Sequence, residues 1–176
     1  MKIGRRTLAL SIIFIWAALC VIALWWFQIQ HIAPFYEHFV EFNGQILRNT
    51  VISNRENRPI VVHFLDPKCP CTGIARAHIA ELEATFSKTV AFYAWPDLPA
   101  QLKTLSETAA VPATPSVAIW SETGELAYFG PYSSGVFCGQ GDDFVSAALR
   151  KLEEQENPGW INHDALGCYC PLNREH

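Results

Sequence analysis

The stretch Ile60–Cys71, IVVHFLDPKCPC, decides the fold of this chain. It begins with a mostly apolar run over Ile60–Leu65, which is typical of a central strand covered on both faces. It ends in a loop with two cysteines, Cys69 and Cys71, separated by one proline, and a helical pattern begins at Thr72. Two thiols between a strand and a helix indicate either thiol–disulfide chemistry or the binding of a soft metal ion.

Helices and strands alternate after this loop. A helix is expected over Thr72–Phe86, because apolar residues recur along one of its sides. The patterns that follow predict a strand over Thr89–Ala94, a helix over Leu98–Thr108, a hairpin of Val117–Trp120 and Leu126–Phe129, and a helix from Asp143 to Glu154. This order predicts an α/β domain with a mixed sheet flanked by helices.

Residues 1–28 are expected to be a basic stub followed by a transmembrane anchor. Thr7–Phe27 contains no charged residue and is long enough for a helix to cross a hydrocarbon core of roughly 30 Å. Trp25 and Trp26 fall near its far end, where aromatic rings favour the membrane interface.

Two other interpretations of this segment are weaker. A cleaved signal peptide needs small residues at its cleavage site, and none follow the apolar run in the required pattern. A lipoprotein anchor at Cys20 would need a small residue before the cysteine, where Leu19 stands. An uncleaved anchor keeps its basic end in the cytoplasm. The expectation is therefore a single-pass protein of the inner (cytoplasmic) membrane, held through residues 7–27, with its C-terminal domain in the periplasm.

The charge of the exported part argues against nucleic-acid partners. The chain has 13 basic and 17 acidic residues, and three of the basic ones precede the apolar run, which leaves 10 against 17 outside the membrane. A surface with this acidic excess attracts neither nucleic acid nor anionic lipid.

Two further segments flank the domain. Residues 29–58 are expected to form a connector with a short amphipathic helix, because Phe35, Phe39 and Phe42 share one helical face. Residues 156–176 form a tail that is rich in aromatic and apolar residues and is expected to pack on the domain. The tail carries a second Cys-x-Cys pair, Cys168 and Cys170.

The strand, the cysteine loop, the helix, the Thr-Pro that opens the hairpin and the last helix together resemble a thioredoxin-like domain, here assigned to residues 59–155. The chain resembles membrane-anchored bacterial thioredoxin-like proteins of poorly defined function that carry Cys-Pro-Cys in place of Cys-x-x-Cys. The resemblance implies that Pro115 is a cis-proline facing the cysteines. It also implies a buried proton acceptor six positions before the first cysteine, where this chain has His63. A histidine there could serve with a pKa near neutrality.

Within the Cys-Pro-Cys loop, Cys69 is expected to be the nucleophile and Cys71 its resolving partner. Lys68 and the N-terminus of the following helix both favour the thiolate of Cys69. A disulfide within Cys-x-Cys closes a smaller ring than one within Cys-x-x-Cys, so such a bond would be strained and oxidising. The alternative is an inert disulfide or two buried thiols.

The remaining cysteines allow two interpretations. Outside the apolar span the chain has five cysteines, so one sulfur stays unpaired, shared or metal-bound. Cys168 or Cys170 could resolve a disulfide begun at Cys69 or relay its electrons. Alternatively, Cys138 bonds one tail cysteine and pins the tail to the last helix, which would stabilise the fold by about 2–4 kcal/mol.

Metal binding uses the same residues. The two Cys-x-Cys pairs offer soft thiolates to Cu(I) or Zn²⁺, with His63, His78 or His163 as accessory ligands. The spacing is shorter than that of zinc sites, and Met1 is the only methionine, so no metal and no cofactor are expected.

The predicted function is that of an exported, membrane-anchored thiol–disulfide oxidoreductase whose partners are protein thiols or disulfides of the envelope. The alternatives are a copper or zinc chaperone and a redox-inactive envelope scaffold.

Overall fold

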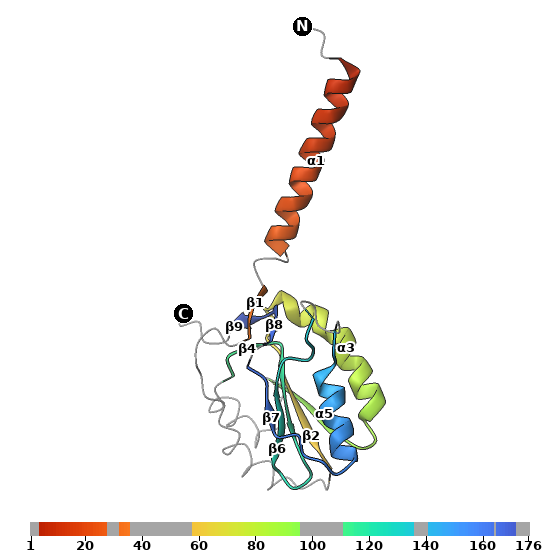
Figure 1. Ribbon diagram of the computed structural model, residues 1–176, viewed down its shortest axis with the longest axis vertical. Helices are drawn as coiled ribbons and strands as arrows, with labels where there is room; N and C mark the ends of the chain where they lie inside the picture. Colours follow the sequence, from red (N-terminus) through yellow and green to blue (C-terminus); the bar gives the residue numbers. More distant parts are fainter. Residues whose placement is uncertain are drawn as a thin grey trace.

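The computed structural model describes residues 4–27, 32–35, 58–95, 111–135, 141–163 and 165–171 (Figure 1). The predicted helix over 98–108, the expected connector helix beyond Phe35 and the position of Cys138 lie outside these ranges. In chain order the elements are α1 Arg5–Phe27, β1 Ile32–Pro34, β2 Ile60–Phe64, α3 Pro70–Phe86, β3 Ala91–Trp95, β4 Ala113–Thr114, β5 Ser116–Trp120, β6 Leu126–Gly130, α5 Phe144–Glu153, β7 Trp160–Ile161, β8 Leu166–Cys168 and β9 Cys170–Pro171.

The predicted α/β fold with a mixed sheet is confirmed. The central sheet has five strands in the order β3-β2-β5-β6-β7. Strand β2 pairs in parallel with β3 and antiparallel with β5, and the hairpin of β5 and β6 lies where the sequence predicts it. Strand β7, from the tail, adds to the sheet in parallel with β6.

Both faces of the sheet are buried, which explains the apolar run of β2. Val61 lies on the face covered by α3 and α5, together with Ile119 and Val145. Val62 lies on the opposite face, in a cluster that also contains Trp120. Because successive side chains of a strand point to opposite faces, a strand between two packed layers must be apolar at nearly every position.

Helix α3 begins earlier than predicted. It starts at Pro70, with Cys69 as the N-cap residue, and not at Thr72. Proline suits the first turn because its fixed φ matches the helix and its missing N–H would have no partner there. The hydroxyl of Thr72 instead donates a hydrogen bond of 2.8 Å to the carbonyl oxygen of Asp66. The predicted C-terminal end of the helix, Phe86, is correct.

Helix α5 is capped by Asp143, whose side chain accepts a 3.0 Å hydrogen bond from the backbone N–H of Ser146. The inner face of the helix is Val145, Ala148 and Leu149. Leu149 is 1% exposed in the core, and Leu152 is partly buried at its edge.

Helix α1 stands apart from the domain in Figure 1. The span Arg6–Trp26 is long and apolar enough to cross a membrane, and none of it is buried within the chain. These are the properties of a membrane anchor or of a signal sequence.

The tail lies packed on the domain. Strand β8 pairs antiparallel with β1, and β9 pairs antiparallel with β4. Phe35, directly after β1, is fully buried and contacts Tyr169 with ring centroids 5.4 Å apart. Chain segments from both sides of the domain therefore meet at the end of the sheet where the cysteine loop lies.

Candidate functional site

Two disulfides connect the Cys-Pro-Cys loop to the tail. Cys69 is bonded to Cys170 and Cys71 to Cys168, with Cα–Cα distances of 5.9 and 5.7 Å. Each loop cysteine is therefore paired with a tail cysteine and not with its neighbour in the loop. Cys69, Cys71 and Cys168 are at most 4% exposed, whereas Cys170 is only partly buried.

The loop that carries Cys69 and Cys71 is held by short-range hydrogen bonds. The carbonyl oxygen of Asp66 accepts from the backbone N–H of Cys69 at 3.0 Å, and the Asp66 carboxylate accepts from the N–H of Lys68 at 2.8 Å. The N–H of Thr72 donates to the carbonyl of Cys69 at 3.1 Å. These bonds place Cys69 at the start of α3 and Cys71 in its first turn.

The tail cysteines are held by two short strand pairings. Cys168 in β8 lies opposite Ile32 of β1, and Cys170 in β9 lies opposite Thr114 of β4. The two bonds are nested, so the first cysteine of one Cys-x-Cys segment is bonded to the second cysteine of the other.

Pro115 follows a cis peptide bond, as the resemblance implied. The residue before it, Thr114, directs its carbonyl oxygen to within 3.7 Å of the Cys69 sulfur. In the disulfide this sulfur carries no proton, so the contact is not a hydrogen bond. In the thiol form the S–H of Cys69 would have an acceptor there.

Three sulfurs of the cluster are mutually close. The Sγ atoms of Cys69, Cys71 and Cys170 all lie within 4.8 Å of one another. A thiolate released from one disulfide would therefore face a sulfur of the other disulfide. The arrangement can exchange disulfide bonds internally, and in its reduced form it can offer several thiolates to one ion.

His63 is buried on the α3 side of the sheet. Its Nδ1 forms a 2.7 Å hydrogen bond with the hydroxyl of Tyr132, and its Nε2 lies 3.9 Å from a carboxylate oxygen of Glu83. Its ring stacks on Phe92 with centroids 5.7 Å apart. Burial, and then the nearby His78, lower the pKa of His63 to about 4. The expected pKa near neutrality is therefore wrong. The role of His63 as a proton acceptor for the cysteines stays a prediction.

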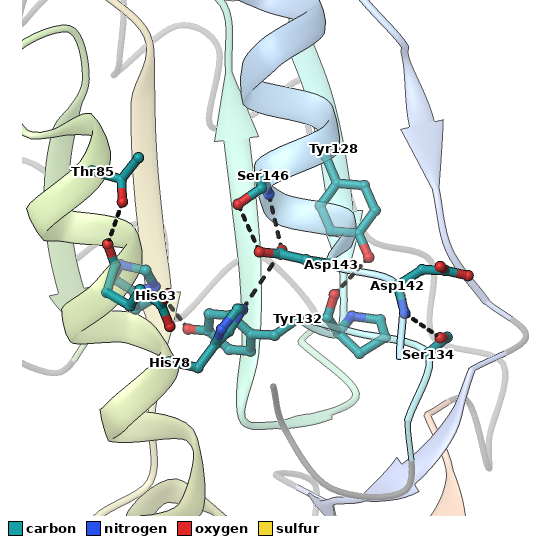
Figure 2. A network of polar contacts seen from close by, with 11 residues as sticks. His63, His78, Thr85, Tyr128, Tyr132, Ser134, Asp142, Asp143 and Ser146 are labelled. Carbon is teal, nitrogen blue, oxygen red and sulfur yellow. Dashed lines mark hydrogen bonds and ion pairs between the residues drawn. The ribbon is translucent and has the colours of Figure 1, made fainter. Parts of the chain in front are cut away.

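A polar network continues from His63 toward helix α5 (Figure 2). His78 packs edge-on against Tyr132 and places its Nε2 3.6 Å from a carboxylate oxygen of Asp143. Burial alone would raise the pKa of the Asp143 carboxyl. His78 and Ser146 more than offset that effect, so the pKa lies below its usual value. This network links α3 to the N-terminus of α5.

The histidines are not grouped with the sulfurs. Among the described residues, the set of possible ligand atoms within 4.8 Å of one another consists of three cysteines and includes neither His63, His78 nor His163. Cys138, the alternative partner predicted for a tail cysteine, lies outside the described ranges. Both tail cysteines are bonded to the loop, so the structure does not contain a bond from Cys138 to either.

The nested pairing of the four cysteines and the strand β1 were not predicted from the sequence. The repeated Cys-x-Cys spacing was the available signal that the two segments belong together. Nothing in the sequence fixed which sulfur bonds which, because four cysteines allow three connectivities.

Comparison with known proteins gives a family. A family described as a domain of unknown function (DUF6436) matches residues 39–172, more than half of the chain. No curated protein matches the chain.

Several solved structures are distantly similar to this chain. A hypothetical protein from Sinorhizobium meliloti 1021 is 13% identical with a TM-score of 0.49, over 71% of this chain and 84% of its own. An uncharacterized conserved protein from Geobacillus kaustophilus is 17% identical with a TM-score of 0.48, over 69% and 79%. A yeast mitochondrial 1-Cys peroxiredoxin is 19% identical with a TM-score of 0.32, over 53% and 82%. At these scores the likenesses carry no argument about activity.

Proposed function

The chain belongs to the DUF6436 family, whose description names no activity, and we propose from its own site that it is a membrane-anchored thiol–disulfide oxidoreductase of thioredoxin-like fold. The observation that carries the proposal is the sulfur cluster. Three sulfurs from two disulfides lie within 4.8 Å of one another at the start of a helix, and the carbonyl oxygen of Thr114 lies 3.7 Å from the Cys69 sulfur. A purely structural pair of disulfides needs no such proximity between one bond and the other.

The proposed reaction begins at the Cys69–Cys170 disulfide. Cys170 is the partly exposed member of the pair, so the thiolate of a partner dithiol attacks its sulfur. A partner–Cys170 mixed disulfide forms, and Cys69 leaves as a thiolate with the electron pair of the broken bond. The second thiol of the partner then attacks the mixed disulfide and releases Cys170. The partner becomes a disulfide, and this chain gains two electrons.

Cys69 is suited to the role of leaving group, and in the reverse direction to that of nucleophile. It caps α3, where unpaired backbone N–H groups and the helix dipole favour negative charge. A thiol that leaves easily as a thiolate also speeds exchange at the bond it leaves.

Cys71 provides the second step. The Cys69 thiolate attacks the sulfur of Cys71, forming a Cys69–Cys71 bond and breaking the Cys71–Cys168 bond, whose electron pair goes to Cys168. The two loop cysteines thus become partners transiently, with Cys69 in the nucleophile role predicted from the sequence and Cys71 as the sulfur that it attacks. The cluster can hold four electrons and pass them between an outer and an inner pair.

The proposed location follows from the apolar helix. If the basic N-terminus stays in the cytoplasm and α1 is kept as an anchor, the proposed position of the domain is in the periplasm, at the surface of the inner membrane. Its partners there are envelope proteins that carry thiols or disulfides.

The test is a redox titration of the full-length chain in detergent micelles. The chain is equilibrated in thiol–disulfide buffers, free thiols are alkylated, and the mass of each cysteine-containing peptide gives the fraction of each disulfide. We expect at least one of the two bonds to titrate between about −120 and −300 mV.

Two variants sharpen this test. Cys69→Ala with Cys170→Ala removes the outer bond and should abolish exchange with a reduced protein substrate, while Cys20→Ala, within α1, should leave it unchanged. If both disulfides resist reduction at −300 mV, they are structural and the oxidoreductase is refuted in favour of a scaffold.

A further inference from the structure

We propose that the reduced cysteine cluster is a binding site for a thiophilic d¹⁰ cation, Cu(I) in preference to Zn²⁺, with Cys69, Cys71 and Cys170 as its ligands. The inference concerns the fully reduced chain, in which both disulfides are open, and does not depend on which partner reduces it. It gives the sulfur cluster a second state, in which an ion replaces the two disulfides.

The distances suit such an ion. Sulfurs bound to one ion at about 2.3 Å stand roughly 4 Å apart, whether three or four of them bind. The three sulfurs of Cys69, Cys71 and Cys170 already lie within 4.8 Å of one another. Once the two disulfides are reduced, their sulfurs are no longer bonded and separate to van der Waals distance. Breaking the bonds therefore moves the cluster toward the geometry of a metal site.

Backbone contacts also help to position these ligands. The loop hydrogen bonds and the first turn of α3 hold Cys69 and Cys71, and the short pairing of β9 with β4 places Cys170 beside Thr114. The sulfurs are largely shielded from water, because Cys69 is 4% and Cys71 0% exposed. Buried thiolates need a positive partner, and an ion supplies it directly.

The spacing favours Cu(I). Zinc sites use cysteines separated by two to four residues, whereas both pairs here are separated by one. Soft thiolate ligands select Cu(I), which is satisfied by fewer ligands than the four of a tetrahedral zinc site. Cys168, bonded to Cys71 in the oxidised chain, then either does not bind the ion or supplies a fourth sulfur ligand.

Reduction of both disulfides consumes two dithiols. Each disulfide takes two electrons and two protons from a dithiol, which becomes a disulfide, so two dithiols convert the cluster into four thiols. The ion then displaces the protons of the thiols that bind it, and these protons pass to solvent. Because the ion binds only the reduced form, it shifts the equilibrium toward reduction.

The experiment uses the full-length chain in detergent micelles. The chain is reduced with dithiothreitol, freed of it by anaerobic gel filtration, and titrated with Cu(I) held by a coloured competing chelator. Native mass spectrometry gives the stoichiometry, and X-ray absorption counts the sulfur ligands. Parallel titrations use Zn²⁺ and the oxidised chain.

We expect one Cu(I) per reduced chain on three or four sulfurs, and none on the oxidised chain. Affinity should fall at least 100-fold in Cys69→Ala and in Cys170→Ala and remain unchanged in Cys20→Ala. The oxidised chain serves as a comparison that needs no substitution, should a variant fold poorly. Absence of bound metal, unchanged affinity in both site variants, or tighter binding of Zn²⁺ would each overturn the proposal. A chain that titrates as a redox pair but binds no ion would leave the oxidoreductase intact.

Discussion

The nested order of the two disulfides predicts how the stability of the fold changes when they are removed. Removing either bond alone should destabilise the fold only modestly, whereas removing both should cost much more than twice as much. The relevant variants are Cys71→Ala with Cys168→Ala, Cys69→Ala with Cys170→Ala, and the quadruple variant. Alanine is chosen because three of the four side chains are at most 4% exposed, and a buried hydroxyl would add its own penalty.

The magnitude follows from the loops that each bond closes in the unfolded chain. The cysteines of the two pairs are 101 and 97 residues apart, and a single bond closing a loop of that size stabilises the fold by about 4.7 kcal/mol. Once one bond exists, the second closes a ring of only about six residues, because the two bonds are joined through one residue on each side, and it adds about 2 kcal/mol. Each double variant should therefore lose about 2 kcal/mol, and the quadruple variant about 7 kcal/mol.

The assay is urea unfolding of the full-length chain in micelles, read by pulse proteolysis of the unfolded fraction. Free thiols are alkylated beforehand so that no bond reshuffles during unfolding. Mapping of the remaining disulfide in each double variant is the control, since the calculation assumes that the other bond stays in place.

Additivity would refute this reasoning. If the loss of unfolding free energy in the quadruple variant equals the sum of the losses in the two double variants, the bonds do not share a loop, and the nested pairing is wrong. A double variant that loses as much as the quadruple variant would show that its remaining bond contributes nothing.

Three further outcomes are expected. His63 has a pKa of about 4 in the folded chain against 6.5 in the unfolded chain, so its contribution to the free energy of unfolding is complete above pH 6.5 and falls by about 3 kcal/mol as the pH falls toward 4. Urea unfolding at pH 7 and at pH 4.5 should show this loss of stability. The variant His63→Asn, which can still bond Tyr132, should show a smaller loss between the two pH values. Gly130→Ala should destabilise by about 2 kcal/mol in the same assay, because φ is 154° and a Cβ would lie 2.8 Å from the Tyr128 hydroxyl oxygen. Asp143→Ala should cost about 1 kcal/mol through the lost cap of α5, whereas Asp143→Asn should retain most of that stability.

The sequence predicted the elements that depend on local patterns and missed those that depend on contacts between distant segments. The strand β2 and the hairpin of β5 and β6 follow from local apolar patterns, and the structure has them within a residue or two of the predicted bounds. The pairing of β1 with β8 was missed, because three residues carry no periodicity and their partner lies at the other end of the chain. The lowered pKa of His63 was missed for a related reason. It depends on burial beside rings such as that of Phe92, and that burial exists only once distant segments have packed.

The same long-range packing ties the cysteine cluster to both ends of the domain. The tail is attached through strands of two and three residues, which are too short to be stable alone, and through the contact of Tyr169 with Phe35. The two disulfides therefore contribute much of what holds Cys168 and Cys170 in place. In the proposed reaction these bonds open, so the sulfurs that take up electrons are also those that fasten the tail. Strand β1, which lies between helix α1 and the domain, pairs with that tail. A change in the redox state of the cluster must therefore alter the stability of the tail and, with it, the attachment of the segment nearest the apolar helix.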